Sequence, residues 1–170
     1  MIRLAIAAAM LLAGPVPDAG AAQVNIVALG ASNTYGMGRG KNMGGVSPGQ
    51  AYPAQLQALL KARGVDARVT NAGVPGDTTG GMLARLGSAV PTGTHIVILE
   101  PGRNDARRGI SVGQRDSNVA EITHRLKARG ITVILLERTR LLAPPANRHP
   151  DGQHFDAGGH ARWRRASCHE

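Results

Sequence analysis

Aromatic residues and cysteine are the two kinds of side chain that this sequence nearly lacks. Phe, Trp and Tyr together make up 2% of the 170 residues, so a core must be assembled from Ala, Val, Ile and Leu. The scarcity of aromatic rings also argues against a groove that stacks sugars or nucleic-acid bases. Cys168 is the one cysteine, so no disulfide can form within the chain and the fold must be stabilised by packing.

Acidic residues are also few. There are 20 Lys plus Arg against 11 Asp plus Glu, which gives a formal net charge of +9. The basic residues are scattered, and their one cluster surrounds Trp163 near the C-terminus. We interpret the charge as a solvated surface that favours anionic substrates or envelope surfaces, and we expect no nucleic-acid partner. A basic module that binds anionic polymers is an alternative.

The apolar segment at the N-terminus is too short to cross a membrane. Arg3 precedes an apolar stretch over Leu4–Leu12, and the small residues of 19–21 (AGA) follow it. This order is typical of a secretory signal. We therefore expect residues 1–22 to be a signal peptide and 23–170 to be one exported domain, periplasmic or secreted. No later segment predicts a membrane span.

Short apolar segments alternate with segments of helical periodicity through the rest of the chain. The strand-like segments are 24–29, 67–71, 95–100 and 131–136. The helix-like segments are 52–63, 82–86, 112–129 and 157–166, and a glycine-rich loop is expected over 30–50. This alternation predicts an α/β fold, a three-layer α/β/α sandwich of the flavodoxin-like kind, with a mostly parallel sheet of about four strands.

Residues that follow the strands are the candidates for chemistry, because ligands bind beyond the carboxyl ends of parallel strands. Residues 30–34 (GASNT) follow the first strand. Three familiar motifs fail there. A nucleophile elbow needs Gly where Thr34 stands, a dinucleotide fingerprint needs Gly where Ser32 stands, and a phosphate loop needs Ser or Thr where Asn42 stands.

Three further blocks follow in order along the chain. Residues 71–78 (NAGVPGDT) come after the second strand, 100–105 (EPGRND) after the third, and 151–154 (DGQH) near the end. Together with residues 30–34, these blocks resemble the SGNH (GDSL-like) hydrolase family. The resemblance extends from about Val24 to His160.

The resemblance implies a serine hydrolase that cleaves carboxylic esters or thioesters through an acyl-enzyme intermediate. Ser32 matches the nucleophile, His154 the base, and Asp151 the acid that orients the imidazole. The oxyanion hole would be formed by the N–H groups of Ser32 and Gly76 and by the side-chain amide of Asn104. The implied substrate is a small-molecule or lipid ester, with neither a cofactor nor a metal.

Each of these residues also has an ordinary structural interpretation. Ser32 and Gly76 are common turn formers, Asn104 could cap a loop, and a lone His154 could lie on the surface. The spacing of His149, Asp151 and His154 permits a metal site, although that reading leaves Ser32 without a role.

The sequence departs from the family pattern at two places. Ala31 stands where the family usually has Asp, so the turn needs stabilisation from Asn33, Thr34 or neighbouring backbone groups. The segment 137–150 is too short for the helix and fifth strand that relatives usually place there. We therefore expect the turn that carries His154 to follow almost directly from the fourth strand, in a more open site. An inactive relative that only binds its ligand is the alternative function.

Overall fold

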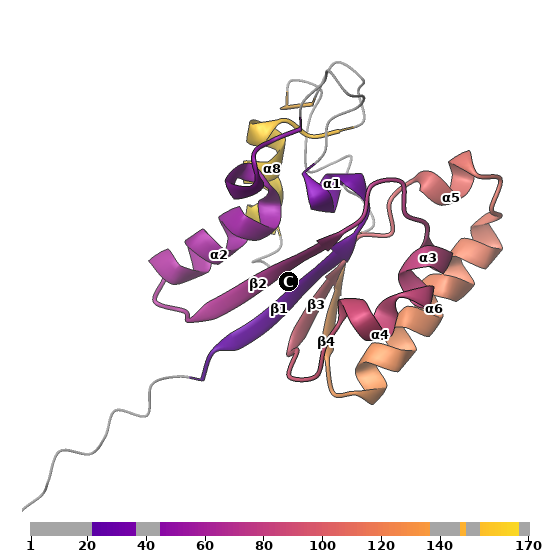
Figure 1. The fold of residues 1–170 in the computed structure, drawn as a ribbon, viewed down its shortest axis with the longest axis horizontal. Coiled ribbons are helices and arrows are strands. Elements are labelled where there is room, and N and C mark those ends of the chain that lie inside the picture. Colours follow the sequence, from indigo (N-terminus) through magenta and orange to yellow (C-terminus); the bar gives the residue numbers. More distant parts are fainter. Residues whose placement is uncertain (1–21, 37–44, 137–146, 149–153, 167–170) are drawn as a thin grey trace, which may run out of the picture.

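A four-stranded parallel sheet lies between helices on both faces. The computed structural model describes residues 22–36, 45–136, 147–148 and 154–166. The strands occur in the order β2-β1-β3-β4 (Figure 1). Their bounds are Val24–Gly30 for β1, Ala67–Gly73 for β2, Ile96–Leu99 for β3 and Thr132–Leu135 for β4. The prediction of an α/β fold with about four parallel strands is confirmed.

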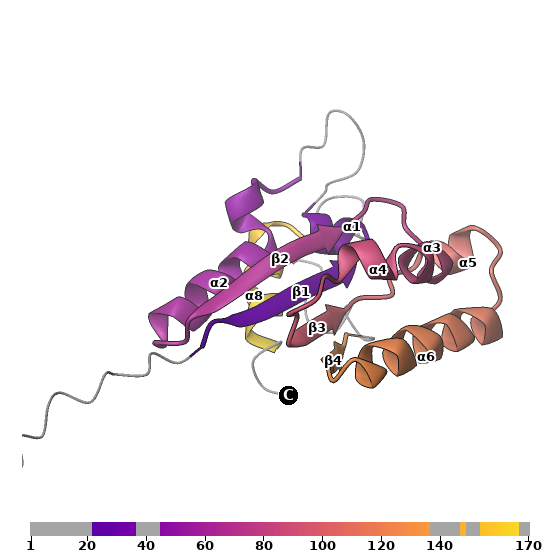
Figure 2. The same ribbon diagram turned by 60° about the horizontal axis from the view of Figure 1, so that its bottom comes forward.

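The helices form the two outer layers. Helices α2 and α8 cover one face, and α3, α4 and α6 cover the other (Figures 1 and 2). The bounds are α2 Tyr52–Ala62, α3 Thr79–Ala84, α4 Leu86–Ala89, α6 Val112–Ala128 and α8 Ala157–Ala166. Three shorter pieces lie in loops: α1 Ser32–Tyr35, the 3-10 helix Pro48–Gln50, and α5 Asn104–Arg107.

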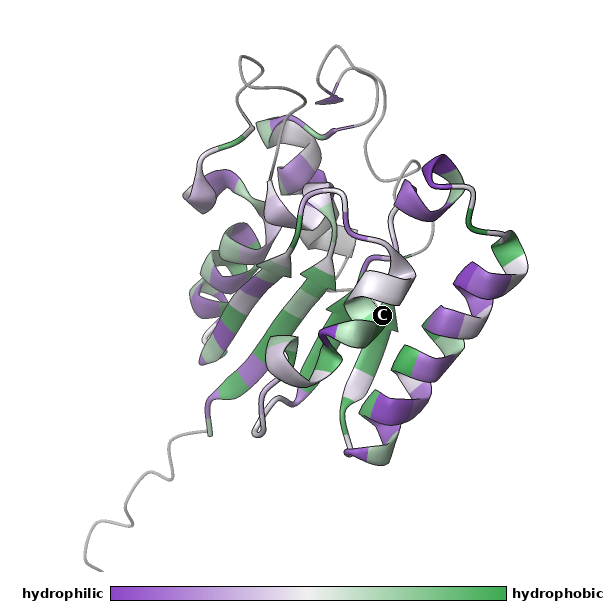
Figure 3. Ribbon diagram, turned by 45° about the vertical axis from the view of Figure 1, so that its right-hand side comes forward, coloured by the Kyte–Doolittle hydropathy of each residue, from purple (hydrophilic) through white to green (hydrophobic). Residues whose placement is uncertain are grey.

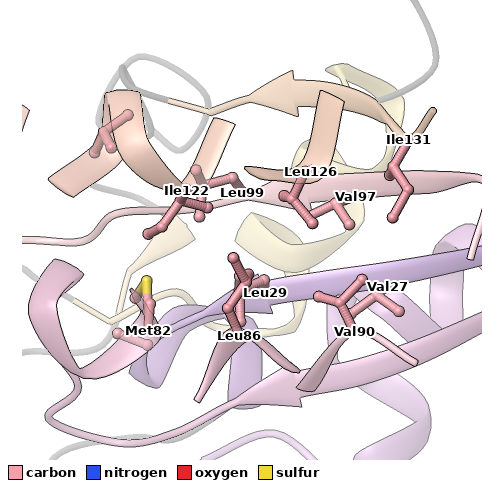
Figure 4. Close-up of a cluster of buried hydrophobic side chains, with 12 residues drawn as sticks. Val27, Leu29, Met82, Leu86, Val90, Val97, Leu99, Ile122, Leu126 and Ile131 are labelled. Carbon is pink, nitrogen blue, oxygen red and sulfur yellow. The ribbon is translucent and has the colours of Figure 1, made fainter. Parts of the chain in front are cut away.

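The central strands are buried on both faces because successive side chains of a strand point to opposite sides. Val27 and Leu29 of β1 enter the core beneath α3, α4 and α6 (Figure 4). Ile26 and Ala28 enter the second core, against α2 and Phe155. Apolar residues are accordingly concentrated on the strands, whereas α6 alternates polar and apolar residues (Figure 3). Double burial explains why the first strand is a nearly continuous apolar run in the sequence.

The element boundaries differ from prediction where the apolar pattern is weak. Helix α1 and the 3-10 helix lie within 30–50, where only a loop was expected. Two short helices, α3 and α4, replace the single helix expected over 82–86. Strand β2 continues to Gly73 instead of ending at position 71, because β1 pairs with it along its whole length. The helix expected over 157–166 is present with those bounds.

Two expectations concern segments outside the described residues. The expected signal peptide falls almost entirely in residues 1–21, and most of the shortened segment falls in 137–146 and 149–150. Within the described ranges, no helix is both long and apolar enough to cross a membrane.

Helix α1 packs against the end of β2 at Gly73. A Cβ atom on Gly73 would overlap the backbone of Tyr35, so the close approach of the two elements requires glycine. We expect Gly73→Ala to lower the free energy of unfolding by about 1–3 kcal/mol, since α1 must move to relieve the overlap. Urea unfolding measures this loss.

Gly87→Ala is the matched control. Gly87 lies in α4, and a Cβ atom there would meet nothing within 4 Å. Because alanine favours a helix more than glycine does, this variant should be as stable as the wild type or more stable by up to about 1 kcal/mol. Equal losses in the two variants would contradict the packing argument.

Candidate active site

The candidate residues gather at the carboxyl edge of the sheet, between β1 and β3. The strand order reverses there, because β2 lies on one side of β1 while β3 and β4 lie on the other. Such a switch point is where parallel α/β sheets bind ligands. Ser32 starts α1 directly after β1, and α5 follows β3. A small cavity is lined there by Ala31, Ser32, Asn33, Glu100, Gly102, Arg103 and Asn104.

Ser32 and His154 meet at this edge. The Nε2 atom of His154 lies 2.9 Å from the Oγ atom of Ser32, although the two residues are 122 positions apart. Both side chains are buried, with 8% of Ser32 and 6% of His154 exposed. A hydroxyl within hydrogen-bond distance of an imidazole can pass its proton to the ring and become a nucleophile. The structure thus brings together two of the three side chains predicted to act on the substrate.

The start of α8 holds His154 in place. The next residue, Phe155, is buried in the core beside α2 and forms an isolated antiparallel bridge with Arg148. One turn further on, the fully buried His160 accepts a hydrogen bond at Nδ1 from the backbone N–H of Tyr52, over 3.3 Å. His160 therefore ties α8 to the start of α2. No role of His160 was predicted from the sequence, because its partner lies 108 positions away.

Glu100 supports the turn that carries Ser32. Its Oε2 atom accepts a hydrogen bond from the N–H of Ala31, at 3.2 Å, and another from the hydroxyl of Thr34, at 3.1 Å. Glu100 is 1% exposed, and burial raises its pKa to about 7, although both hydrogen bonds act in the opposite direction. Thr34 thus helps to hold the turn. This support was expected, because Ala31 stands where the family pattern has an aspartate. Glu100 was not among the site residues predicted from the sequence.

Asn104 faces the same cavity as Ser32. Its side-chain nitrogen donates a hydrogen bond to the backbone carbonyl of Asp77, at 2.7 Å. An amide group carries two N–H donors, so this bond orients the group and leaves the second donor for another acceptor. Asn104 is 9% exposed, and a donor in such a site is little screened by water.

Gly76 lies in the loop that follows β2. Its φ angle of 77° is in the left-handed region, and its carbonyl accepts a hydrogen bond from the Arg108 guanidinium at 2.9 Å. Arg85 also holds this loop, by contacts with the loop and with the ends of two strands. The guanidinium of Arg85 pairs with the Asp77 carboxylate at 2.7 Å and donates to the carbonyls of Gly30 and Ala72, the latter in β2. The loop is therefore fixed to the ends of both β1 and β2.

Asp151 lies outside the described residues, so its position next to His154 stays a prediction. The alternative metal site of His149, Asp151 and His154 also stays untested, because His149 lies outside the described residues. Among the residues that the structure describes, no group of three His, Cys, Asp or Glu side chains is arranged to hold a metal ion. The bridge between Arg148 and Phe155 brings together the two ends of the stretch that contains Asp151.

The chain is similar to a family of lipases and acylhydrolases and to individual esterases. Residues 28–168 match the model of the GDSL-like lipase/acylhydrolase family. The chain is 38% identical over 93 residues to the esterase TesA of Pseudomonas aeruginosa, a match that covers 54% of this chain and 46% of TesA. It is 33% identical over 89 residues to an arylesterase of Vibrio mimicus, covering 52% of this chain and 44% of that relative. These matches span about half the length of each curated relative.

The chain is also similar to solved structures of esterases. The chain is similar to AlinE4, an SGNH-hydrolase family esterase, with 35% identity and a TM-score of 0.59, over 73% of this chain and 62% of that one. A crystal structure of TesA shares the fold, with a TM-score of 0.71 at 24% identity, over 83% of this chain and 94% of that one.

The buried carboxyl of Glu100 gives the protein a distinctive pH dependence of stability. The pKa of this group is about 7 in the folded protein, against an ordinary value of 4.5. Between these values the native state holds a proton that the unfolded state has released. The free energy of unfolding therefore falls as the pH rises from about 4.5 to about 7, by about 3 kcal/mol at most.

Glu100→Gln removes the ionisation and keeps the shape of the side chain. We expect the difference in unfolding free energy between pH 5 and pH 8, measured with urea, to be smaller in this variant than in the wild type. The same pH dependence in both proteins would contradict a raised pKa for Glu100.

Proposed function

Since the chain belongs to the GDSL-like lipase/acylhydrolase family, we propose that it is a serine hydrolase that cleaves carboxylic esters or thioesters. The observation that carries the proposal is the 2.9 Å distance between His154 Nε2 and Ser32 Oγ. This arrangement fits acyl transfer, in which a base must take the proton of the attacking hydroxyl.

In the first half of the proposed reaction, the Ser32 oxygen attacks the carbonyl carbon of the ester while His154 takes the hydroxyl proton. The tetrahedral intermediate collapses when the bond to the leaving group breaks, and His154 gives its proton to the departing alcohol or thiol. In the second half, His154 removes a proton from water, which attacks the acyl-enzyme. Breaking the bond to Ser32 returns its proton and releases the carboxylic acid.

Negative charge develops on the carbonyl oxygen in both halves. We assign its stabilisation to the backbone N–H groups of Ser32 and Gly76 and to the free N–H of the Asn104 side chain. Ser32 is the first residue of α1, so its N–H has no partner within that helix. The bond from Asn104 to the Asp77 carbonyl fixes the amide before substrate arrives, and preorganised donors of this kind are the most effective.

Asp151 completes the proposed triad. A carboxylate beside the second ring nitrogen of His154 would hold the tautomer in which Nε2 accepts a proton, and it would stabilise the imidazolium that forms. We also propose that the enzyme acts after export, on small-molecule or lipid esters, as the signal-like residues 1–22 suggest.

Ser32→Ala and His154→Ala test the proposal. The wild type should hydrolyse p-nitrophenyl acetate and butyrate, and each substitution should lower kcat by about 10³-fold or more, because nucleophile and base act as one unit. Initial rates at saturating substrate measure this loss. Ser117→Ala and His124→Ala are matched controls on the exposed side of α6 and should keep wild-type rates. Equal rates in wild type and Ser32→Ala would reject the proposal and favour a protein that only binds its ligand.

Asp151→Asn tests the third member separately. We expect kcat to fall by about 10³-fold or more with little change in the melting temperature, since the amide cannot stabilise the imidazolium. Asp156→Asn is the control, because Asp156 accepts the N–H of Gly159 near the start of α8 and asparagine can do the same. A full rate in Asp151→Asn would assign the orienting role to another group.

A further inference from the structure

We propose that Glu100 is a positioning residue for Ser32, whose buried carboxyl fixes the nucleophile by accepting hydrogen bonds from both sides of it. This inference rests on the proposed function, because it assigns to Glu100 an effect on the rate of ester cleavage. The effect is indirect, since Glu100 acts through the turn that carries Ser32.

The two hydrogen bonds come from the residues that flank the nucleophile. Ala31 precedes Ser32 and Thr34 follows it by two positions, and both donate to the same Glu100 oxygen. Helix α1 has four residues and no side-chain cap at its start, because Ala31 has no polar side chain. A single helical turn of this length is not stable by itself. Its position must therefore come from contacts with its surroundings, and Glu100 supplies two of them.

Gly30 leaves the space in which these groups meet. A Cβ atom on Gly30 would overlap the Thr34 hydroxyl and would come within 2.9 Å of Glu100 Oε2. Both Thr34 and Glu100 are almost completely buried, so neither can swing away into solvent. Because Gly30 ends β1 without a side chain, the carboxyl of Glu100 has room to lie beneath the turn.

The role of the carboxyl as a hydrogen-bond acceptor does not depend on its charge. The side chain of Tyr52, from α2, lies beside Glu100 and Thr34. Burial raises the pKa of Tyr52 above its usual range, so the phenol is uncharged. The Oε2 atom of Glu100 can accept both hydrogen bonds whether the carboxyl is ionised or protonated on Oε1. Glutamine can therefore accept the same two hydrogen bonds, whereas an apolar side chain of similar size cannot.

The experiment compares Glu100→Gln, Glu100→Leu and Thr34→Val in the full chain, with p-nitrophenyl butyrate as the probe. We expect Glu100→Gln to keep kcat within about threefold of the wild type. Glu100→Leu should lower kcat by about 100-fold while KM changes by less than about threefold, because a small displacement of the nucleophile affects the reaction more than substrate binding. Thr34→Val removes one of the two hydrogen bonds and should lower kcat by about tenfold.

Leu126→Ala separates positioning from stability. Leu126 is fully buried in the core beneath α6, and its truncation should lower the melting temperature without lowering kcat well below that temperature. A wild-type kcat in both Glu100→Leu and Thr34→Val would overturn the proposal. So would losses of kcat that Leu126→Ala reproduces at the same loss of melting temperature.

A second measurement does not depend on turnover. In ¹H–¹⁵N spectra, the amide signal of Ala31 should titrate with a midpoint near 7 in the wild type and lose that transition in Glu100→Gln. Hydrogen exchange of the Ala31 amide should be about tenfold faster in Glu100→Leu than in the other two proteins. If the wild type hydrolyses no ester, the proposed function fails, whereas these signals still show whether Glu100 holds the turn. Ala31 signals that are the same in all three proteins would overturn this role of Glu100.

Discussion

The contact between the Ser32 hydroxyl and the His154 imidazole is the interaction on which the rest of the account depends. Each residue is held by a different part of the fold. Ser32 stands on one helical turn at the end of the central strand β1, and His154 precedes the C-terminal helix α8. The 2.9 Å distance therefore requires α1 to be fixed on the sheet and α8 to be fixed on α2. Buried polar contacts do both, through Glu100 for α1 and through His160 for α8.

These buried polar groups lie in a core that is otherwise made of aliphatic side chains. Removing a carboxyl or an imidazole from water is unfavourable unless hydrogen bonds compensate. Glu100 receives two such bonds, and the price of its burial remains visible in the raised pKa. Two aromatic side chains lie at the same place, because Tyr52 and Phe155 belong to the core cluster between the sheet and the α2 and α8 layer. The scarce large side chains thus support the helix that positions His154.

The fold was predictable because its main elements have strong local patterns. The buried strand β1 is a nearly continuous apolar run, and α6 and α8 follow helical spacing and end near the expected residues. Helices α1 and α5 were not predicted, because four residues are too few to show a helical period. The resemblance to a family gave the roles of Ser32 and His154. It gave no role to Glu100, whose partners lie 66 and 69 positions away, because the meeting of these residues is a property of the folded chain.

Labelling with a fluorophosphonate tests the central claim most directly, because this reagent forms a stable adduct with a serine that an adjacent imidazole has activated. The account predicts that intact-mass and peptide analysis will find one adduct, on Ser32, and that His154→Ala will abolish it while the protein remains folded. An adduct that forms equally well without His154, or a folded wild type in which Ser32 does not react, would contradict the account.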